Sequence, residues 1–363
     1  MKVVTQIVLL AGALAGAAVL APRPLGSMGG GVDSTGYRGV SLAGAEFGTH
    51  VPGFGGSAPG TLGVDYTYPT SETMRHFAQV GMTHFRLPVR WERLQGVLGG
   101  DLNDVELGRI FETLDTASLL DCQVVLDLHN YGRYCRGESR YPNGRIVGAP
   151  ATDGQGITQE HLSDLWCKLS ERLRGHQAIE AFALMNEPHD MGQASWRKIS
   201  QHVVDALRIH GDRTTLWISG DSWSNSYYWQ RNNGSQAWIA DPLDDVVYEA
   251  HCYFDHDFSG TYQLSFDEEQ GRDGAVLARG ISRVAPFLDW CKRNGVRGVI
   301  GECGVPRDDP HWLPVLAALL KSATARQTPV YYWAAGEWWG DNPLSIQPKG
   351  GEQAAPLRVL LER

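Results

Sequence analysis

The chain has 363 residues, enough for two small domains or for one large domain such as an α/β barrel. Hydrophobic residues make up 42% and charged residues 20%, a balance typical of a folded protein and not of a disordered one. With 32 Lys and Arg against 41 Asp and Glu the formal net charge is −9, so the basic excess of a general nucleic-acid binder is missing and we expect no nucleic-acid partner.

Residues 1–25 have the pattern of an export signal. Lys2 precedes the apolar run 7–21, which is shorter than the ~20 residues that span a bilayer and has the length of the apolar core of a secretory signal. Pro22 stands directly after the candidate cleavage site, so a cleaved signal peptide and an uncleaved membrane anchor are both open. Residues 26–33 are rich in glycine and are predicted to form a tether. The sequence thus predicts an exported protein, secreted or periplasmic, with membrane contact only through this segment.

Eight apolar runs rich in β-branched and aromatic residues predict eight strands. They are residues 38–42, 83–89, 123–129, 179–185, 215–219, 246–251, 298–301 and 330–333.

Between several of these runs the apolar residues have helical spacing. The helical positions are Leu107, Ile110 and Leu114; Leu162, Leu165, Trp166 and Leu169; Trp196, Ile199, Val203 and Leu207; Ile281, Val284, Leu288 and Cys291; and Trp312, Val315, Leu316 and Leu319. Strands that alternate with helices in this way predict an α/β fold, a (β/α)8 TIM barrel formed by a single domain over residues 34–363.

The carboxyl ends of the predicted strands carry polar or aromatic side chains, and catalytic residues of (β/α)8 barrels lie at these ends. In chain order they are Arg86, His129 with Asn130, Asn186 with Glu187, Trp223, His251 with Tyr253, Glu302 and Trp333. Glu187 and Glu302 end the fourth and seventh strands, so we expect them to face each other across the barrel mouth. Paired carboxylates are what glycoside hydrolysis requires, because one protonates the leaving oxygen and the other attacks the anomeric carbon or activates water.

This ordered set of residues resembles glycoside hydrolase family 5, and within it the endoglucanase (cellulase) branch. The motif positions of the family are matched by Arg86, His129, Asn186, Glu187, His251, Tyr253, Glu302 and Trp333. Four longer phrases also resemble the cellulase pattern: GVSLAGAEFG, LHNYGRY, YEAHCYFDHDFSGTY and YWAAGEWWGDNPLSIQP. The resemblance implies a retaining endo-β-1,4-glucanase that acts on a polysaccharide, with Glu187 as acid/base and Glu302 as nucleophile. We expect it to work as a monomer without cofactor or metal.

A retaining site holds its carboxyl groups roughly 5 to 5.5 Å apart, with one of them ionised. Glu302 must be the ionised one, and Arg86 can hold it so by charge-assisted hydrogen bonding. Tyr253 can donate a hydrogen bond to it, and in the family both residues contact the nucleophile. The resemblance gives Asn186 a contact with the 2-hydroxyl of the sugar.

The remaining strand-end residues are expected to support the site or to contact substrate. His129 and His251 are predicted to order the polar floor, and Asn130 adjoins His129. Trp333 offers a ring face under the sugar in the −1 subsite. Trp223 is either a further sugar platform or part of the packing of its loop.

The six cysteines show neither a CxxC pair nor the Cys/His spacing of a zinc site, so no metal centre is predicted. They are Cys122, Cys135, Cys167, Cys252, Cys291 and Cys303. We expect mostly buried thiols, with one or two disulfides open for an exported protein. Cys252 and Cys303 directly follow His251 and Glu302, so strand alternation predicts that they face the helical layer.

The residues at the strand ends also bear on two other classes of barrel protein and on the choice of glycan. A metal-dependent barrel hydrolase should have His-x-His at the end of the first strand, where this chain has SLAGAEFG. A non-catalytic glycan-binding barrel should have lost one of the two glutamates. Within the enzymes, cleavage of mannan or of a mixed-linkage glucan stays open, because loops select the sugar at each subsite.

The long loop after the third strand is basic in an otherwise acidic chain. Against the single acid Glu138 it carries Arg133, Arg136, Arg140 and Arg145. One hypothesis is that these arginines pin the loop by pairing with carboxylates such as Glu46, Glu138 or Asp153. The other is that they meet a β-1,4-glucan bearing acidic groups. Glu337, in the loop after the eighth strand, has no assigned role.

Overall fold

The eight predicted strands all form, and together they close a barrel. The computed structural model describes residues 37–137 and 144–362. Neighbouring strands are parallel throughout. In their order around the barrel they are β1 (Arg38–Leu42), β2 (His84–Val89), β3 (Gln123–Leu128), β6 (Ile179–Ala183), β7 (Thr215–Ser219), β8 (Val246–His251), β9 (Arg297–Cys303) and β10 (Val330–Ala335), which returns to β1. The predicted (β/α)8 fold is confirmed.

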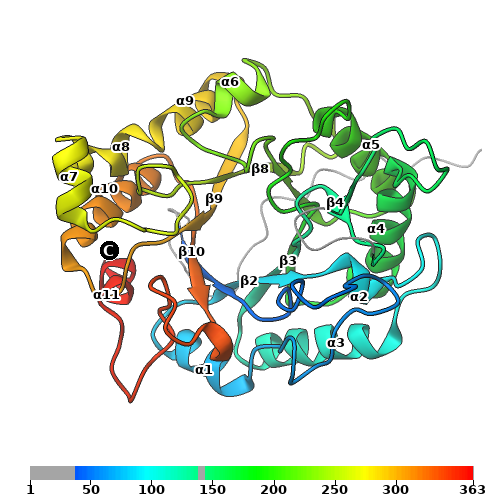
Figure 1. Cartoon of the computed structure of the whole chain (residues 1–363), viewed down its shortest axis with the longest axis horizontal. Helices are drawn as coiled ribbons and strands as arrows, with labels where there is room; N and C mark the ends of the chain where they lie inside the picture. Colours follow the sequence, from blue (N-terminus) through cyan, green and yellow to red (C-terminus); the bar gives the residue numbers. More distant parts are fainter. Residues whose placement is uncertain (1–36, 138–143, 363) are drawn as a thin grey trace, which may run out of the picture. The chain divides into compact units, whose positions relative to one another are not determined.

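Helices surround the strands on the outside of the barrel, with α1 and α3 on one side, α4 and α5 on another and α7 to α10 on a third (Figure 1). The helices are α1 (Ser71–Gln79), α2 (Trp91–Leu94), α3 (Asp104–Leu119), α4 (Gln159–Leu173), α5 (Trp196–Ile209), α6 (Trp229–Asn233), α7 (Phe266–Arg272), α8 (Arg279–Ser282), α9 (Ala285–Asn294), α10 (Leu313–Thr324) and α11 (Ala355–Leu361). Short 3-10 turns are η1 (Val276–Ala278), η2 (Pro310–Trp312) and η3 (Glu337–Trp339), and a two-stranded ribbon pairs β4 (Arg133–Tyr134) with β5 (Arg145–Ile146).

The single helix predicted from Ile281 to Cys291 is wrong in part. The chain forms two helices there, α8 and α9, and the side chain of Ile281 is 56% exposed instead of buried. Pro286 stands in the first turn of α9. A proline lacks the backbone N–H of a helix interior and clashes with the preceding turn, so it begins a new helix instead of continuing the old one.

Between β7 and β8 the helical layer is reduced to the five residues of α6. An aromatic cluster covers the sheet in this place. The ring of Trp229 lies edge-to-face against that of Trp290, with centroids 5.5 Å apart, and Trp238 meets Tyr248 at 4.7 Å. Large rings fill the space that a longer helix fills elsewhere in the barrel.

The inside of the barrel has an apolar layer below a polar one. The apolar layer consists of Val125, Ala181, Ala183, Trp217, Val247, Val299 and Tyr331. Arg86, Asp127 and Glu249 are also fully buried; Asp127 and Glu249 lie in the carboxyl-terminal halves of their strands, and Arg86 is the third residue of β2. Charged groups buried this deeply need partners, and these partners connect the barrel to the site at its mouth.

All six cysteines lie in the described residues and are free thiols, five of them buried and Cys167 half-buried. None of the disulfides that the sequence left open is present. Cys252 and Cys303 belong to the hydrophobic core that also contains helix residues such as Val315, in agreement with the prediction from strand alternation. The predicted leader 1–25 and tether 26–33 lie outside the described residues and stay predictions.

Candidate active site

Glu187 and Glu302 come together at the carboxyl ends of the barrel strands. Glu187 follows β6 and adopts a left-handed conformation with φ of 42°, while Glu302 is part of β9. One carboxylate oxygen from each and a ring nitrogen of His251 all lie within 4.8 Å of one another. This spacing fits the roughly 5 to 5.5 Å between the carboxyl groups of a retaining glycosidase and leaves too little room for the intervening water of an inverting one.

His251 joins the two glutamates. Its Nδ1 lies 2.6 Å from Oε1 of Glu187 and 3.4 Å from Oε2 of Glu302. Burial lowers the pKa of His251, but the negative charges of Glu302 and Glu187 outweigh burial and raise it to about 10. The imidazole is therefore a cation at neutral pH.

Arg86 holds Glu302 from the β2 side. It is fully buried, and its Nη1 donates to Oε1 of Glu302 at 2.9 Å while Nη2 donates to Oδ1 of Asn186 at 2.7 Å. Ion pairs to Asp127 and Glu249, each at 3.2 Å, complete its surroundings. Although burial lowers the pKa of Arg86, these carboxylates raise it overall, so the guanidinium stays charged.

Tyr253 holds the other oxygen of Glu302. Its hydroxyl donates to Oε2 at 2.8 Å. Burial, together with the charge of Glu302, raises the pKa of Tyr253 well above its usual value, so the hydroxyl keeps its proton. Burial also raises the pKa of Glu302, to about 7, while His251, Arg86 and the Tyr253 hydrogen bond oppose the rise. Glu302 thus ionises near neutral pH.

His129 lies in a buried hydrogen-bonded network beside Asn186. Its Nδ1 is 2.8 Å from Oδ2 of Asp127, and its Nε2 is 2.9 Å from the hydroxyl of Tyr131. Burial, with the charge of Arg86, lowers the pKa of His129 well below its usual value. A neutral ring that donates from Nδ1 and accepts at Nε2 satisfies both contacts. Trp333 stacks on this imidazole with ring centroids 5.2 Å apart.

Asn130 does not face the barrel mouth, although the sequence grouped it with the site. Its Oδ1 accepts from the backbone N of Trp91, and its Nδ2 donates to Glu92 and to the backbone O of Arg133. The amide is fully buried and fully occupied by these partners, so Asn130 supports the loop after β3.

Trp223 is 47% exposed, and its ring stacks on His189 with centroids 4.3 Å apart. Nδ1 of His189 donates to the backbone O of Glu187 at 3.0 Å. An exposed indole close to Glu187, the candidate acid, is suited to stack against a sugar. This favours the sugar platform over the loop packing that the sequence also left open.

Two buried carboxylates of this site were missed by the sequence analysis. Asp127, on β3, precedes by two residues His129, which directly follows that strand; Glu249 precedes His251 by two residues on β8. Because strand side chains alternate between the two faces, an acid at this spacing faces the same way as the histidine. The phrases LDLH and YEAH therefore held a signal that would have found both.

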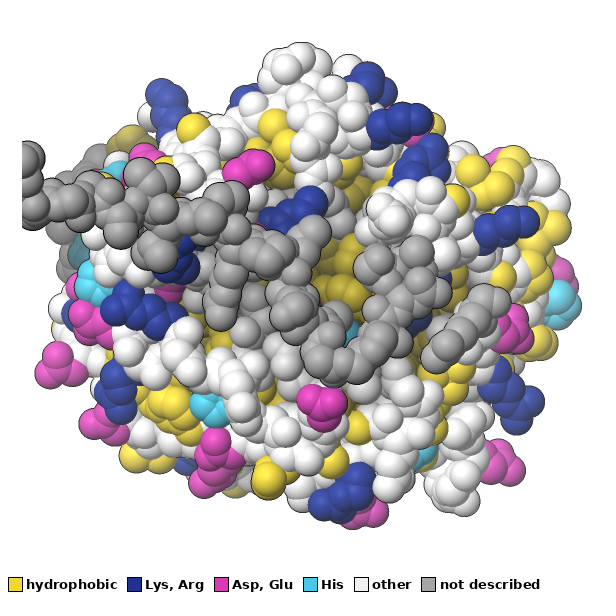
Figure 2. Space-filling view, turned by 180° about the vertical axis from the view of Figure 1, so that it is seen from behind, with side chains coloured by type: hydrophobic (Ala, Val, Ile, Leu, Met, Phe, Trp, Pro, Cys, Tyr) yellow, Lys and Arg dark blue, Asp and Glu magenta, His cyan; other side chains and the backbone are white. Residues whose placement is uncertain are grey.

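The arginines of the loop after β3 are partly accounted for. Arg145 pairs with Asp153 at 2.7 Å, which is one of the pairings predicted for a pinned loop. Arg133 is buried and donates to the backbone O of Tyr131. Arg136 is exposed. Glu138 and Arg140 lie outside the described residues. On the face shown in Figure 2, the described Lys and Arg side chains are interspersed with Asp and Glu.

The two other glutamates near the mouth have structural partners. Glu337 accepts from the backbone N and the hydroxyl of Thr70, at 2.9 and 2.6 Å, and so ties the loop after β10 to the first turn of α1. Glu46 is buried and accepts from the backbone N of Gly44 at 2.7 Å. Burial raises the pKa of Glu46 to about 8, so it is largely neutral at pH 7 and does not serve as an anionic partner for the arginines.

Known proteins share this fold and sequence pattern. Residues 40–338 match the family model of cellulase, glycosyl hydrolase family 5. Endo-beta-1,4-glucanase B of Emericella nidulans is 30% identical over 318 residues, 87% of each chain, and endo-beta-1,4-glucanase A of the same organism is 29% identical over 319 residues, 87% of this chain and 88% of that one. The crystal structure of Pseudomonas stutzeri endoglucanase Cel5A in complex with cellobiose is 33% identical and covers 91% of this chain and 93% of that one, with a TM-score of 0.79. The chain belongs to the cellulase family, glycosyl hydrolase family 5, as its strand-end residues had indicated.

Proposed function

We propose that this chain is a retaining endo-β-1,4-glucanase in which Glu302 is the nucleophile and Glu187 the acid/base. The observation that carries the proposal is the spacing of the two carboxylates, which meet around His251 within 4.8 Å. The similarity to endo-beta-1,4-glucanases supports β-1,4-glucan as the substrate.

In the first step Oε of Glu302 attacks the anomeric carbon while Glu187 protonates the glycosidic oxygen of the leaving chain. The product is a covalent glycosyl-enzyme ester. In the second step Glu187 takes a proton from water, the water oxygen bonds to the anomeric carbon, and the ester bond breaks to regenerate the Glu302 carboxylate. Two displacements on the same carbon leave the β-configuration unchanged.

The surrounding residues position the reacting groups. Arg86 and Tyr253 each bind one oxygen of Glu302, which fixes the plane of the carboxylate for attack. Asn186, held by Arg86, donates its amide to the 2-hydroxyl of the sugar in the −1 subsite, a contact that strengthens in the oxocarbenium-like transition state. Trp333 provides a ring face for that sugar, and Trp223 lies on the Glu187 side, where the leaving chain departs.

Hydrolysis of cellohexaose followed by proton NMR tests this proposal. We expect cleavage at internal bonds, with the β-anomer of the new reducing end appearing first. Initial release of the α-anomer would contradict the double displacement. Mannan and a mixed-linkage glucan are assayed alongside cellohexaose, and faster cleavage of either one would contradict β-1,4-glucan as the preferred substrate.

We further propose that the enzyme acts outside the cytoplasm, since residues 1–25 have the pattern of an export signal. Within the described residues no helix combines the length and hydropathy needed to cross a membrane. Sequencing the amino terminus of the exported protein distinguishes a cleaved signal, with a new start near residue 22, from a retained anchor.

A further inference from the structure

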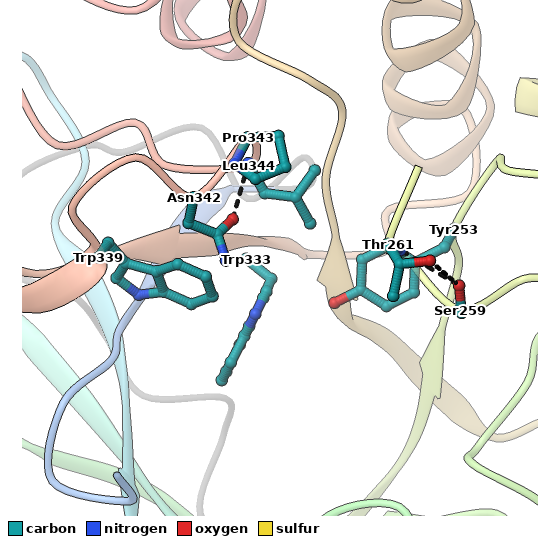
Figure 3. A pocket seen from close by; sticks show the side chains of 9 residues that line it. Tyr253, Ser259, Thr261, Trp333, Trp339, Asn342, Pro343 and Leu344 are labelled. Carbon is teal, nitrogen blue, oxygen red and sulfur yellow. Dashed lines mark hydrogen bonds between the residues drawn. The ribbon is translucent and has the colours of Figure 1, made fainter. Parts of the chain in front are cut away.

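A cavity of about 250 Å³ opens beside the carboxylate pair, between the loops that follow β8 and β10. Figure 3 shows it with the ring of Trp333 on one side and Tyr253 on the other. The side chains that line it include Tyr253, Ser259, Thr261, Trp333, Asn342 and Leu344. Tyr253, whose hydroxyl binds Glu302, lines the cavity, so the cavity adjoins the nucleophile.

The contacts of Glu302 fix which part of a bound sugar faces this cavity. One oxygen of Glu302 binds Arg86, which also binds Asn186, and the other oxygen binds Tyr253. In the proposed function the 2-hydroxyl lies at Asn186. In a pyranose ring the anomeric carbon stands between C2 on one side and the ring oxygen on the other, and C5, which carries C6, follows the ring oxygen. The C6 arm therefore extends away from Asn186, toward Tyr253 and the cavity.

The walls of the cavity combine apolar surface with a few hydrogen-bonding groups, as is usual in small-ligand sites. Trp333, Trp339, Pro343 and Leu344 supply the apolar surface. The hydroxyls of Ser259 and Thr261 lie 2.7 Å apart on one wall. On the other wall, Oδ1 of Asn342 accepts from the backbone N of Leu344 at 2.9 Å, and no described residue accepts from its Nδ2. That amide group remains available as a donor.

The volume of the cavity and the charges near it restrict the kind of ligand that it can bind. Drug-sized ligands occupy pockets of roughly 300 to 1,000 Å³, and the volume here lies just below that range, which suits a single sugar unit. The Oγ of Ser259 also lies 2.9 Å from Oδ2 of Asp255 and 2.7 Å from Oδ1 of Asp257, and its one proton is donated to one of these carboxylates. Carboxylates directly behind the wall repel an anionic group, so a neutral ligand is favoured.

We propose that this cavity binds a neutral monosaccharide substituent on O6 of the glucosyl unit in the −1 subsite, which lets the enzyme cleave a β-1,4-glucan directly after a decorated unit. The inference rests on the proposed function, because the position of C6 follows from the roles given to Glu302 and Asn186.

The test uses the purified full chain with two substrates, undecorated cellohexaose and a β-1,4-glucan whose glucosyl units carry α-xylosyl groups on O6. The unit bound in the −1 subsite becomes the new reducing end, so reduction of the products followed by tandem mass spectrometry reads directly whether that unit was substituted. We expect products with a substituted reducing end. If the decorated polymer is left intact, or every new reducing end is unsubstituted, while cellohexaose is cleaved, this inference is overturned and the proposed function stands. Failure on cellohexaose overturns both.

Substitutions inside and outside the cavity test whether cleavage of the decorated polymer depends on the cavity. Thr261→Trp fills the cavity and should lower kcat/KM on the decorated polymer, relative to cellohexaose, at least tenfold, because even a single methylene that no longer fits a pocket costs roughly 10- to 200-fold. Val97→Trp adds the same ring at a position that is 74% exposed and outside the cavity, and it should leave that ratio unchanged. Should Thr261→Trp fail to fold, Thr261→Leu gives a smaller loss in the same direction. A ratio that stays constant in a folded Thr261 variant contradicts the assignment.

Discussion

Gly301 and Glu249 share one small space beneath the active site. A Cβ atom on Gly301 would lie 2.0 Å from Oε1 of Glu249, a distance at which the Glu249 side chain would have to move. That oxygen is 3.2 Å from Nε of Arg86 and 3.4 Å from Nε2 of His251. The absence of a side chain at residue 301, next to Glu302, therefore allows a buried carboxylate to contact two of the cations around the nucleophile.

Glu249→Gln should lower the pKa of His251, which an NMR titration of its ring protons measures. Burial raises the pKa of Glu249, but Arg86 and His251 outweigh it and lower the pKa to about 2, so Glu249 is an anion beside His251. Removing an anion destabilises protonated His251, whose pKa then falls. Ser219→Ala is the matched control, since it removes a 2.9 Å hydrogen bond to Glu249 and leaves the charge in place. Equal His251 pKa values in wild type and Glu249→Gln would show that Glu249 has no influence on His251.

Glu302→Gln should abolish hydrolysis of every substrate, because no nucleophile remains to form the ester. Glu187→Ala should lose roughly 10² to 10⁴-fold on cellohexaose, the usual contribution of a general acid. An aryl cellobioside with a good leaving group needs little protonation and should escape most of that loss. Initial rates on both substrates measure the difference. Near-normal cleavage of cellohexaose by either variant would contradict the catalytic role assigned to the residue that was replaced.

Arg86→Lys should lower kcat by about 10² to 10³-fold, the usual cost of removing a preorganised electrostatic contact. The guanidinium reaches Glu302 and Asn186 from two different nitrogens, at 2.9 and 2.7 Å, and an ammonium group cannot reproduce this fork. The thermal midpoint should be measured with the turnover number. Wild-type turnover at unchanged stability would leave Arg86 with a structural role alone.

Tyr253→Phe should move the acid limb of the pH profile to higher pH. Glu302 must be ionised to attack, and burial already raises its pKa to about 7. The Tyr253 hydroxyl stabilises the carboxylate through a 2.8 Å hydrogen bond, so its removal raises that pKa further. The limb is read from kcat/KM between pH 4 and 8, which reports the free enzyme. A shift to lower pH would contradict the hydrogen bond as the cause.

The ratio of activities on an anionic and a neutral β-glucan should change by less than about twofold between low and high salt. Of the arginines that suggested an acidic substrate, Arg145 is paired with Asp153 and Arg133 is buried against backbone oxygens. Carboxymethylcellulose and barley β-glucan serve as the pair, for wild type and for Arg136→Gln with Arg140→Gln. A ratio that falls as salt shortens the Debye length from about 10 Å at 0.1 M, and falls again in the double variant, would establish attraction of an acidic polymer.

The sequence alone determined the barrel and the outline of its site. Hydrophobic periodicity identified all eight strands, because a parallel strand buried on both faces is a continuous apolar run that turns polar where it ends. The polar residues at those ends, above all Glu187 and Glu302, could therefore be identified from the sequence alone. The alternation rule also placed Cys252 and Cys303 correctly on the far side of their strands.

Only the tertiary structure decided which of these residues touch one another. Asn130 sits beside His129 in the chain, yet its amide turns away to Trp91 and Glu92, because a loop backbone obeys no fixed period. Glu249 acquires its role from contacts with Arg86 on β2 and His251 on its own strand. Strand closure brings such partners together from distant parts of the chain, and burial then sets their pKa values. Neither effect can be calculated from spacing along the sequence.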